Sequence, residues 1–470
     1  MPSSLKQIRN DVPTVSLYVF LVIAGMLSLY STSRPPEGYD WNIPELLASD
    51  VGKQFVWLIL SAGAWFVVNH FIRRDFWVRG AYPIYAGTVV LLLLVLVAGK
   101  EINNARSWFS LFGFTFQPSE LAKLGAALAM AAYLSQWTGK LRSVGPVASA
   151  LAIMAVPAGL IVLQPDPGSA LVFFSFVLVL YREGLAPQLV VFGLFTVAAL
   201  LLGILQPTPV LVGGLMCLLI FVLALSVPRR LRWWLAGAVA VAAAAATGLY
   251  LDLGWPVLAG VTLAFVASAA YHTLRRNFAL VATTLAFLVW GSAVAFVADF
   301  TFYNVFRQHQ QDRIDAWLRP ERLDEQGPLY NIIQSKLAIA AGGLQGRGFG
   351  EGTITKYDYV PEQETDFIFS AVGEAQGFVG SAMVILAFLG LLWRISVIAE
   401  RQNRTFGRAY AYGIAGILLI HMLVNIGMTM GVMPVIGIPL PFVSKGGSSL
   451  LSFTIMIAVL VKIDRHRADV

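Results

Sequence analysis

Long apolar stretches, separated by short polar segments, fill almost the whole chain. A helix needs about 20 mostly apolar residues to cross a bilayer, and about fourteen stretches approach that length. They lie near residues 15–30, 52–71, 80–98, 119–136, 146–164, 168–182, 187–205, 209–227, 232–250, 254–272, 278–298, 367–393, 408–428 and 446–462. The pattern predicts an all-α polytopic integral membrane protein whose first stretch is a retained span and not a cleaved signal.

The composition excludes an ordinary soluble domain. Of the 470 residues, 57% are hydrophobic and 13% are charged, and the mean hydropathy is +0.72. The net charge of +7 comes from Lys and Arg in every second connecting segment, for example 73–79, 229–232 and 394–408. Such residues collect in cytoplasmic loops, so we expect both termini to be cytoplasmic and no nucleic acid to be bound. The single Cys217 and five scattered histidines predict neither a disulfide framework nor a histidine metal site.

Residues 299–365 form the longest polar segment. It holds ten carboxylates against seven Lys or Arg, which is not the balance of a cytoplasmic loop. Within it, residues 328–343 have apolar side chains at helical spacing, which predicts a helix lying on or dipping into the membrane surface. We therefore expect 299–365 to be a large, ordered loop on the extracytoplasmic face.

Residues 187–275 are rich in Ala, Leu and Val and almost free of polar residues in mid-span. This texture predicts four lipid-facing scaffold helices, inserted into a single membrane domain that covers residues 1–470. The sequence has no visible internal repeat, which disfavours a transporter built from inverted repeats.

Charged residues within apolar stretches are costly and need an explanation. Glu120 and Lys123 stand three residues apart on one predicted helical turn and are expected to pair, with Ser119 as the N-cap. They form a structural ion pair, a charged wall of a substrate cavity, or both. Asp166, between two prolines, is expected to cap the next helix. Glu374 is surrounded by glycines that allow close helix packing, so we expect it to face the bundle.

Two arginines in polar segments each have two interpretations. Arg106 stands beside Trp108 and Phe109, as in an interfacial aromatic belt, but a guanidinium also binds diphosphate oxygens bidentately. Arg347 lies in the glycine-rich run GGLQGRGFGEG. That run either offers its backbone N–H groups and Arg347 to phosphates or is a flexible loop without this role.

Asp366 stands at the point where a polar loop becomes an apolar helix. A carboxylate there costs little to hydrate and can still face the head group of a lipid-linked substrate. It is either the N-cap of the helix predicted at 367–393, worth about 1 kcal/mol, or a general base or electrostatic catalyst.

Taken together, five segments resemble the SEDS family (shape, elongation, division and sporulation). They are NNARSWFSLFGFTFQPSELAKL, VLQPDPGSALVF, YNIIQSKLAIAAGGLQGRGFGEGT, VPEQETDFIFSAVGEAQGFVG and NIGMTMGVMPVIGIPLPFVSKGGSSLL, and they occur in the family's order. GIPLPF is similar to the elongation members more than to the division members. Three features depart from the family pattern: Pro167 where Leu is usual, Lys445 where Tyr is usual, and four spans beyond a ten-helix core.

The resemblance implies a SEDS fold and a peptidoglycan glycosyltransferase. Such an enzyme polymerises lipid II on the outer face of the bacterial inner membrane during cell elongation. Asp366 matches the family's essential aspartate, whose implied role is to remove the proton from the acceptor GlcNAc 4-hydroxyl. That oxygen attacks the anomeric carbon of the donor MurNAc, with inversion from α to β, and undecaprenyl diphosphate leaves.

The resemblance also implies roles for other residues and molecules. Gln117, Asp166 and Glu374 are expected to be structural or to line the cavity. A class B penicillin-binding protein, a single-span transpeptidase of the elongation machinery, is the expected partner. No tightly bound cofactor is expected, although the diphosphate could carry Mg²⁺ or Mn²⁺. The expected substrate-binding residues are Arg106, Glu120, Lys123, Lys336, Arg347, Ser444 and Lys445.

Two other classes of protein account for some of the same features. A lipid II flippase would use the intramembrane Glu120, Lys123 and Glu374 for ion coupling or head-group passage. Against it, the polar motifs cluster on the predicted outer side. A non-catalytic scaffold of the cell-wall machinery would tolerate any change at Asp366.

Overall fold

The computed structural model describes residues 11–33, 49–102, 105–111, 114–136, 143–225, 237, 241, 254–323 and 327–467. The chain divides into two compact units. The first combines residues 1–186 with 313–470, and the second is 187–312. The first unit therefore contains all five segments that carry the family resemblance.

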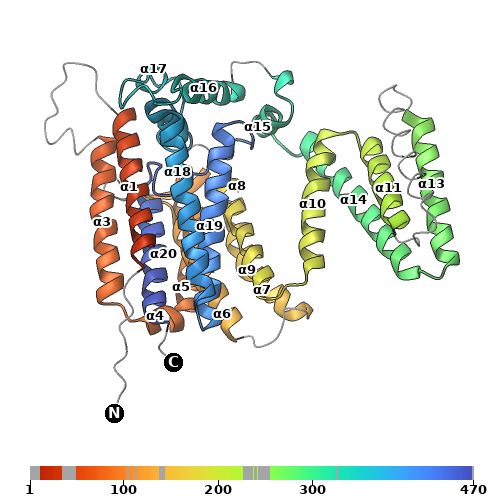
Figure 1. The fold of residues 1–470 in the computed structure, drawn as a ribbon, viewed down its shortest axis with the longest axis horizontal. Coiled ribbons are helices and arrows are strands. Elements are labelled where there is room, and N and C mark those ends of the chain that lie inside the picture. Colours follow the sequence, from red (N-terminus) through yellow and green to blue (C-terminus); the bar gives the residue numbers. More distant parts are fainter. Residues whose placement is uncertain are drawn as a thin grey trace, which may run out of the picture. The chain divides into compact units, whose positions relative to one another are not determined.

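Helices from both ends of the chain build the first unit (Figure 1). The predicted span at 168–182 is divided into α8 (Pro167–Leu171), the 3-10 helix η1 (Val172–Ser175) and α9 (Phe176–Arg182). The N-terminal part also supplies α1 (Val12–Thr32), α3 (Asp50–His70), α4 (Arg74–Arg79), α5 (Ala81–Ala98), α6 (Pro118–Gln136) and α7 (Val144–Val162). The C-terminal part supplies α15 (Gln308–Leu318) from residue 313 onward, η3 (Pro320–Arg322), α16 (Pro328–Ala341), α17 (Thr353–Lys356), α18 (Ile368–Glu400), α19 (Thr405–Thr429) and α20 (Gly447–Arg465).

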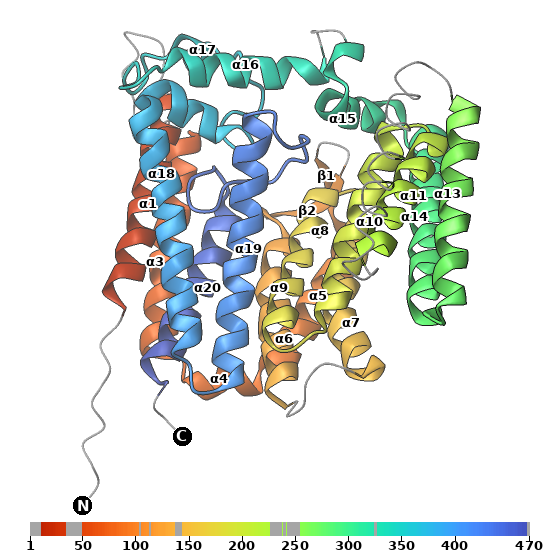
Figure 2. The same cartoon turned by 45° about the vertical axis from the view of Figure 1, so that its right-hand side comes forward.

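The centre of the first unit is formed by α6, α19 and α20, which pack on one another. Around them, α5 packs on α6, α18 on α19 and α3 on α20, while α1 packs on α18 (Figure 2). Most residues of α6 are buried, and many are alanines that let neighbouring helices approach closely. Because protein surrounds α6, it does not need the strongly apolar composition of a lipid-facing helix.

Eleven described helices are long and apolar enough to cross a membrane: α1, α3, α5, α7, α18, α19 and α20 here, with α10, α11, α13 and α14 of the second unit. They confirm the prediction of a multi-pass membrane protein. The central α6 is less apolar, and Pro167–Arg182 is shorter. The span predicted at 232–250 lies outside the described residues, apart from positions 237 and 241.

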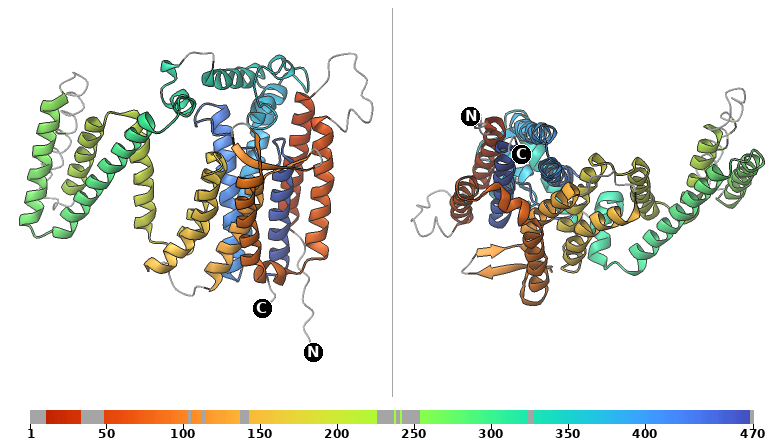
Figure 3. Two further views of the ribbon diagram at one scale, coloured as in Figure 1. Left: turned by 180° about the vertical axis from the view of Figure 1, so that it is seen from behind. Right: turned by 90° about the horizontal axis from the view of Figure 1, so that it is seen from below.

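A small antiparallel sheet precedes α6, so the prediction of an all-α protein is wrong in this respect. Its strands are β1 (Lys100–Ile102), β2 (Ala105–Leu111) and β3 (Phe114–Phe116), paired in the order β1-β2-β3. At the end of this stretch, the run FGFTF alternates aromatic residues with Gly and Thr, with the period of two that is typical of a strand. The strands project from the side of the helices (Figure 3, right).

The large polar segment begins later than predicted, because the helix before it continues to Asn304. Residues 299–304 are therefore helical and not loop. The helix predicted at 328–343 is confirmed as α16, which packs on α18 and α19. In Figure 1, α16 and α17 lie across one end of the first unit's helices.

Ionic contacts connect helix ends at the end of the first unit that lies opposite α16 and α17. Asp11, the N-cap of α1, accepts hydrogen bonds from Arg394 at 2.7 Å and from Arg401 at 2.6 Å. Arg401 also binds Asp464 in the last turn of α20. The first described turn of α1 and the last turn of α20 therefore lie at the same end of the bundle.

The second unit consists of α10 (Pro187–Leu205), α11 (Thr208–Leu225), α13 (Gly254–Leu274) and α14 (Phe278–Asn304). α14 packs on α10 and α11, and α11 packs on α13. Gly203 permits the closest approach, since a Cβ there would lie 2.7 Å from the Cα of Ala295. The unit extends past the predicted insertion, 187–275, because α14 belongs to it.

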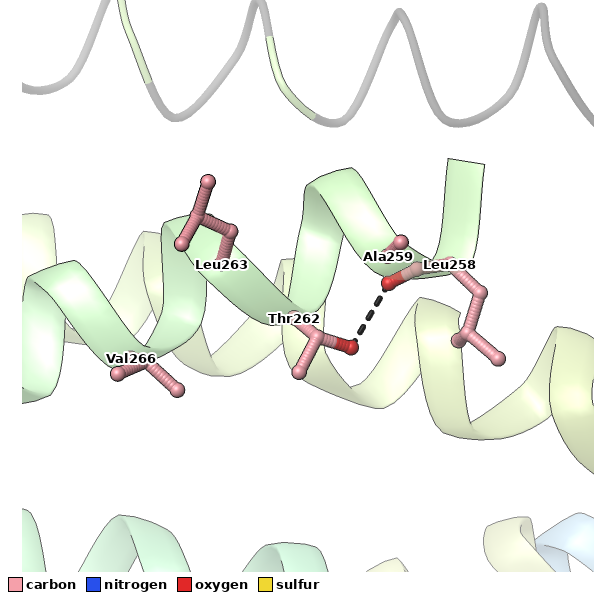
Figure 4. Close-up of a pocket in the computed structure, with 5 residues that line it drawn as sticks. All are labelled: Leu258, Ala259, Thr262, Leu263 and Val266. Carbon is pink, nitrogen blue, oxygen red and sulfur yellow. Dashed lines mark hydrogen bonds between the residues drawn. The ribbon is translucent and has the colours of Figure 1, made fainter. Parts of the chain in front are cut away.

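A pocket of about 460 Å³ lies on α13 (Figure 4). It is lined by Leu258, Ala259, Thr262, Leu263 and Val266. The Thr262 hydroxyl donates to the Leu258 carbonyl at 2.7 Å within the same helix. The lining is thus apolar apart from one satisfied hydroxyl, and it has no group suited to acid–base chemistry.

Candidate active site

Asp366 lies in a tight turn just before α18. The N–H groups of Thr365, Asp366 and Phe367 all donate to the Glu362 carbonyl, at 3.2, 3.1 and 3.2 Å. The helix begins at Ile368 with Phe367 in the capping position and no side-chain cap. The interpretation of Asp366 as an N-cap is therefore wrong, and its carboxylate is left for another role.

Residues 430–446, which connect α19 to α20 and are called the C-terminal loop below, hold this turn in place. Asn425 of α19 donates through Nδ2 to the Asp366 carbonyl at 2.9 Å and to the Ile438 carbonyl at 2.7 Å. The Ser444 hydroxyl donates to the Thr365 carbonyl at 2.6 Å and accepts from the Leu440 N–H at 2.8 Å. The backbone on both sides of the catalytic candidate is thereby fixed by donors that are themselves buried.

Gly437 of the C-terminal loop leaves room for the carboxylate itself. Its φ of +74° lies in the left-handed region that glycine adopts readily. A Cβ at this position would stand 3.1 Å from Asp366 Oδ2. A side chain here would therefore be strained and would also crowd the carboxylate.

The surroundings of Asp366 favour its protonated form. Protein encloses the residue, although its side chain keeps partial access to solvent. Burial, together with the carboxylates of Glu362 and Asp166, raises the pKa of Asp366 to about 7, while Arg313 lowers it. No described residue makes an ion pair or hydrogen bond with the Asp366 carboxylate, so it is free to take a proton from a ligand.

The predicted role of Asp166 as a helix cap is confirmed. The residue also lies close enough to Asp366 for its charge to act on that carboxylate. It is the N-cap of α8, accepting the Ser169 N–H at 3.0 Å. Its other oxygen accepts from Gln117 Nε2 at 2.9 Å. Gly168 next to it packs on the C-terminal loop, since a Cβ there would lie 2.8 Å from the Ile436 carbonyl. Gln117 and Asp166 thus belong to the wall beside Asp366.

The predicted pair of Glu120 and Lys123 is present but fully buried. Lys123 Nζ donates to Glu120 Oε1 at 2.8 Å and to His421 Nε2 at 2.9 Å. His421 Nδ1 donates in turn to the Pro439 carbonyl at 2.9 Å, which fixes the tautomer. Each of the two charged side chains is 1% exposed. Through His421, this buried chain of contacts reaches the C-terminal loop at Pro439. The predicted cap at Ser119 is wrong, because α6 already begins at Pro118.

Glu374 faces the interior, as predicted, and binds backbone. Its two oxygens accept the N–H groups of Ile354 at 3.0 Å and Thr355 at 2.8 Å. It is fully buried and thereby fixes α17 against α18. Its described contacts indicate a structural role.

Several N–H groups of the glycine-rich run already have partners within the protein. Arg347 and Gly348 donate their N–H groups to the carbonyls of Glu374 and Ala375, both at 3.0 Å. α18 is kinked at Gly377, whose φ is +64°, and a Cβ on Gly377 or Gly346 would overlap the backbone of the other segment. These contacts fix the run against α18 and leave fewer N–H groups for a phosphate, so the described contacts favour a structural role for it.

The predicted cations occupy different environments. Arg106 on β2 is half exposed and lies 3.8 Å from Glu101. Arg347 is exposed and donates to the Ala341 carbonyl and the Thr353 hydroxyl. Lys336 is exposed on α16 and packs beside Gly431 of the C-terminal loop. Lys445 is held between two carboxylates, so its predicted contact with substrate finds no support in its described contacts.

The sequence did not single out several residues that the fold brings to Asp366 or to the C-terminal loop beside it: Asn425, Glu362 and Arg313 act on Asp366, and His421 contacts the loop. Asn425 and His421 stand four residues apart on the otherwise apolar α19, and that spacing was a usable signal. Arg313 acts from α15, more than fifty positions before Asp366, and nothing in its local sequence indicated this.

Fold and site together define a multi-pass membrane protein with a semi-buried carboxylate at one end of its helices. The family model of the FtsW/RodA/SpoVE cell cycle proteins matches residues 13–209 and 204–469. The chain is 30% identical over 449 residues to the peptidoglycan glycosyltransferase RodA of Treponema pallidum, covering 95% of each protein. It is 39% identical over 197 residues to the peptidoglycan glycosyltransferase MrdB of Escherichia coli, covering 41% of this chain and 53% of that one.

Solved structures agree with this assignment. A chain from a study of a peptidoglycan synthase complex superposes with a TM-score of 0.63 at 25% identity, covering 98% of this chain and 100% of that one. The rod shape determining protein RodA of Thermus thermophilus shares the fold, with a TM-score of 0.57 at 24% identity over 98% and 99% of the two chains. The chain belongs to the FtsW/RodA/SpoVE family.

Proposed function

We propose that this protein is a peptidoglycan glycosyltransferase that polymerises lipid II into glycan strands during cell elongation. Relatives that span its whole length carry that activity in their names. The observation that carries the proposal is Asp366, a carboxylate with a pKa raised to about 7 by burial, held in a fixed turn and partly open to solvent. A general base works best when its pKa lies near the working pH.

In the proposed reaction, Asp366 removes the proton from the acceptor GlcNAc 4-hydroxyl. The resulting oxygen nucleophile forms a bond to the anomeric carbon of the donor MurNAc. The bond from that carbon to the diphosphate oxygen breaks, and undecaprenyl diphosphate leaves with the electron pair. One displacement inverts the α-linked donor to a β-linked product, and Asp366 ends the step protonated.

The leaving diphosphate needs positive charge near the reacting carbon. Arg313 is the cation whose field reaches Asp366, so we add it to the predicted Arg106, Lys336 and Arg347 as a candidate. Within the described part of the chain, no group of three or more His, Cys, Asp or Glu side chains is placed to hold a metal. Mg²⁺ is often held by only one or two carboxylates together with substrate phosphates, so the divalent cation on the diphosphate stays a prediction, and the step above uses only groups of this chain.

We further propose the arrangement in the membrane. The protein would lie in the bacterial inner membrane with about fourteen spans, both termini in the cytoplasm and Asp366 on the outer face. The arginine contacts that connect the ends of α1, α18 and α20 support a cytoplasmic location for that end. The proposed partner is a class B penicillin-binding protein, and one structural neighbour comes from a study of a peptidoglycan synthase complex.

Polymerisation by the purified chain with its transpeptidase and lipid II tests the proposal directly. Glycan strands that lengthen with time are the expected product. Movement of lipid II across liposome membranes without strand formation would instead identify a flippase and contradict the proposal.

The rate of polymerisation should depend on pH with a midpoint near 7. The base is active only when ionised, so the rate should fall about tenfold for each pH unit below 7 and level off above it. Glu362→Gln removes one of the carboxylates that raise the pKa of Asp366, so its midpoint should move to lower pH. Initial rates from pH 5 to 9 test both expectations, and a flat profile for the wild type would contradict the role of Asp366 as base.

Asn425→Ala should lower kcat by roughly tenfold with little change in KM, because the Asp366 and Ile438 carbonyls lose their shared donor and the turn shifts. Lipid II kinetics in detergent provide the measurement. Asn403→Ala is the matched control, since Asn403 lies at the opposite end of the unit and should leave kcat unchanged. A normal kcat for Asn425→Ala would show that this contact does not position Asp366.

A further inference from the structure

An ion cluster of Asp50, Glu364 and Lys445 lies where the C-terminal loop meets α3 and the Asp366 turn. Lys445 Nζ donates to Glu364 Oε2 at 2.6 Å and lies 2.8 Å from Asp50 Oδ2. The Lys445 N–H also donates to the Glu364 carbonyl at 2.7 Å. The second Glu364 oxygen accepts the Ser33 hydroxyl just after α1, at 2.9 Å. One ammonium thus connects α3 to a residue two positions before Asp366, and Glu364 extends the contact to the end of α1.

The residues after Lys445 also contact α3. Gly446 donates its N–H to Gln54 Oε1 at 3.2 Å. Trp57 packs so tightly on Gly447 that a Cβ there would overlap the indole. Asp50, Gln54 and Trp57 have the spacing of one helical face, so this end of the C-terminal loop follows α3 for two turns. Lys445 therefore starts from a backbone position that is fixed on α3, within reach of both carboxylates.

The charge balance of the ion cluster depends on Lys445. Burial alone would lower the pKa of Lys445, but its hydrogen bonds with Asp50 and Glu364 raise it above the ordinary value. Lys445 is about one-third exposed, so the contacts are partly shielded from water. Lys53 lies 4.0 Å from Asp50, and both side chains are substantially exposed. Without Lys445, the carboxylates of Asp50 and Glu364 would face each other with only the more distant and exposed Lys53 beside Asp50.

Three consecutive residues of the turn are held by three different donors. Lys445 binds Glu364, Ser444 binds the Thr365 carbonyl and Asn425 binds the Asp366 carbonyl. The first of these contacts is ionic, and its loss would produce repulsion between α3 and the turn. A displacement of about 1 Å in a catalytic group is enough to cost on the order of 100-fold in rate.

We propose that Lys445 is a positioning residue, whose ammonium neutralises Asp50 and Glu364 and so keeps the Asp366 turn seated against α3. This inference rests on the proposed glycosyltransferase function. Lys445 was predicted to bind substrate; we propose instead that it affects catalysis by holding Glu364, and with it the Asp366 turn.

Kinetics of Lys445→Met distinguish positioning from substrate binding. We expect kcat to fall roughly tenfold or more while KM changes little, because the side chain does not touch substrate. Lys445→Arg should keep most of the activity, since a guanidinium also binds two carboxylates. Lys53→Met is the matched control, because Lys53 shares Asp50 but does not reach Glu364, and its rate should equal that of the wild type. A rise in KM at unchanged kcat for Lys445→Met would overturn the proposal.

A second substitution tests the repulsion itself. Asp50→Asn in the Lys445→Met background removes one of the two facing carboxylates, so part of the lost kcat should return. A lysine that bound substrate would not be rescued in this way. Failure of Asp50→Asn to restore any activity would contradict the proposed role of the ion cluster.

Hydrogen exchange provides a readout that does not depend on activity. Amides 362–367 of the full-length protein should exchange faster in Lys445→Met than in the wild type or in Lys53→Met. Unchanged exchange together with unchanged kcat would overturn the proposal. If the wild type forms no glycan strands, the proposed function is what fails, and the exchange rates of these amides alone then decide the role of Lys445.

Discussion

Asp366→Asn should abolish lipid II polymerisation while leaving the fold intact. The asparagine side chain has the same shape but cannot accept a proton, so we expect the rate to fall by about 10²- to 10⁴-fold, the usual contribution of a general base. The substitution should not unfold the protein, because the described carboxylate holds no helix cap, ion pair or hydrogen bond and the turn is fixed through backbone atoms. The measurement is strand formation from lipid II at saturating substrate.

The matched control for this substitution is Asp75→Asn. Asp75 is exposed in the first turn of α4, away from the C-terminal loop, and its loss should not change the rate. Equal strand formation by Asp366→Asn and Asp75→Asn would reduce Asp366 to a structural residue. It would then favour a scaffold or a flippase over a polymerase.

Lys123→Met should destabilise the protein by about 3–5 kcal/mol, the usual result of removing one partner from a buried ion pair. Glu120 would lose the only cation that contacts it among the described residues, and one of its oxygens already lacks a partner there. His421 would also lose the donor at Nε2, which weakens its support of the Pro439 carbonyl. The measurement is the thermal unfolding midpoint of the purified protein in detergent.

A double substitution separates the loss of the ion pair from the burial of an unpaired carboxyl group. Glu120→Gln combined with Lys123→Met removes both charges, so it should unfold at a higher temperature than Lys123→Met alone. Lys100→Met, at an exposed position on β1, is the control and should unfold like the wild type. A midpoint for Lys123→Met that equals the wild-type value would show that the buried pair contributes nothing to stability.

The sequence was sufficient for features that depend on local pattern. Apolar length predicted the membrane helices, because a lipid-facing helix must be apolar along its whole length. The Pro-Asp-Pro pattern predicted the cap at Asp166, and the spacing of Glu120 and Lys123 predicted their contact. The sheet before α6 was missed because its short strands carry too few apolar residues for length alone to register.

Features that depend on distant contacts could not be predicted in the same way. Asn425 and His421 appeared as isolated polar residues, because their partners lie in the C-terminal loop, in the Asp366 turn and on α6. The N–H groups of Arg347 and Gly348 donate to carbonyls of α18 beside its kink at Gly377. No local sequence pattern indicated that kink. Asp366 does precede an apolar helix, as predicted, but it is not the cap, because the helix begins at Ile368 with Phe367 in the capping position.

The most direct test of the central claim is the initial rate of lipid II consumption by wild type and Asp366→Asn, reconstituted with the transpeptidase and compared at equal folded concentration. We expect glycan strands from the wild type and none from a mutant that still unfolds at the wild-type temperature and still binds lipid II. Equal rates for the two proteins would contradict the assignment of Asp366 as the general base.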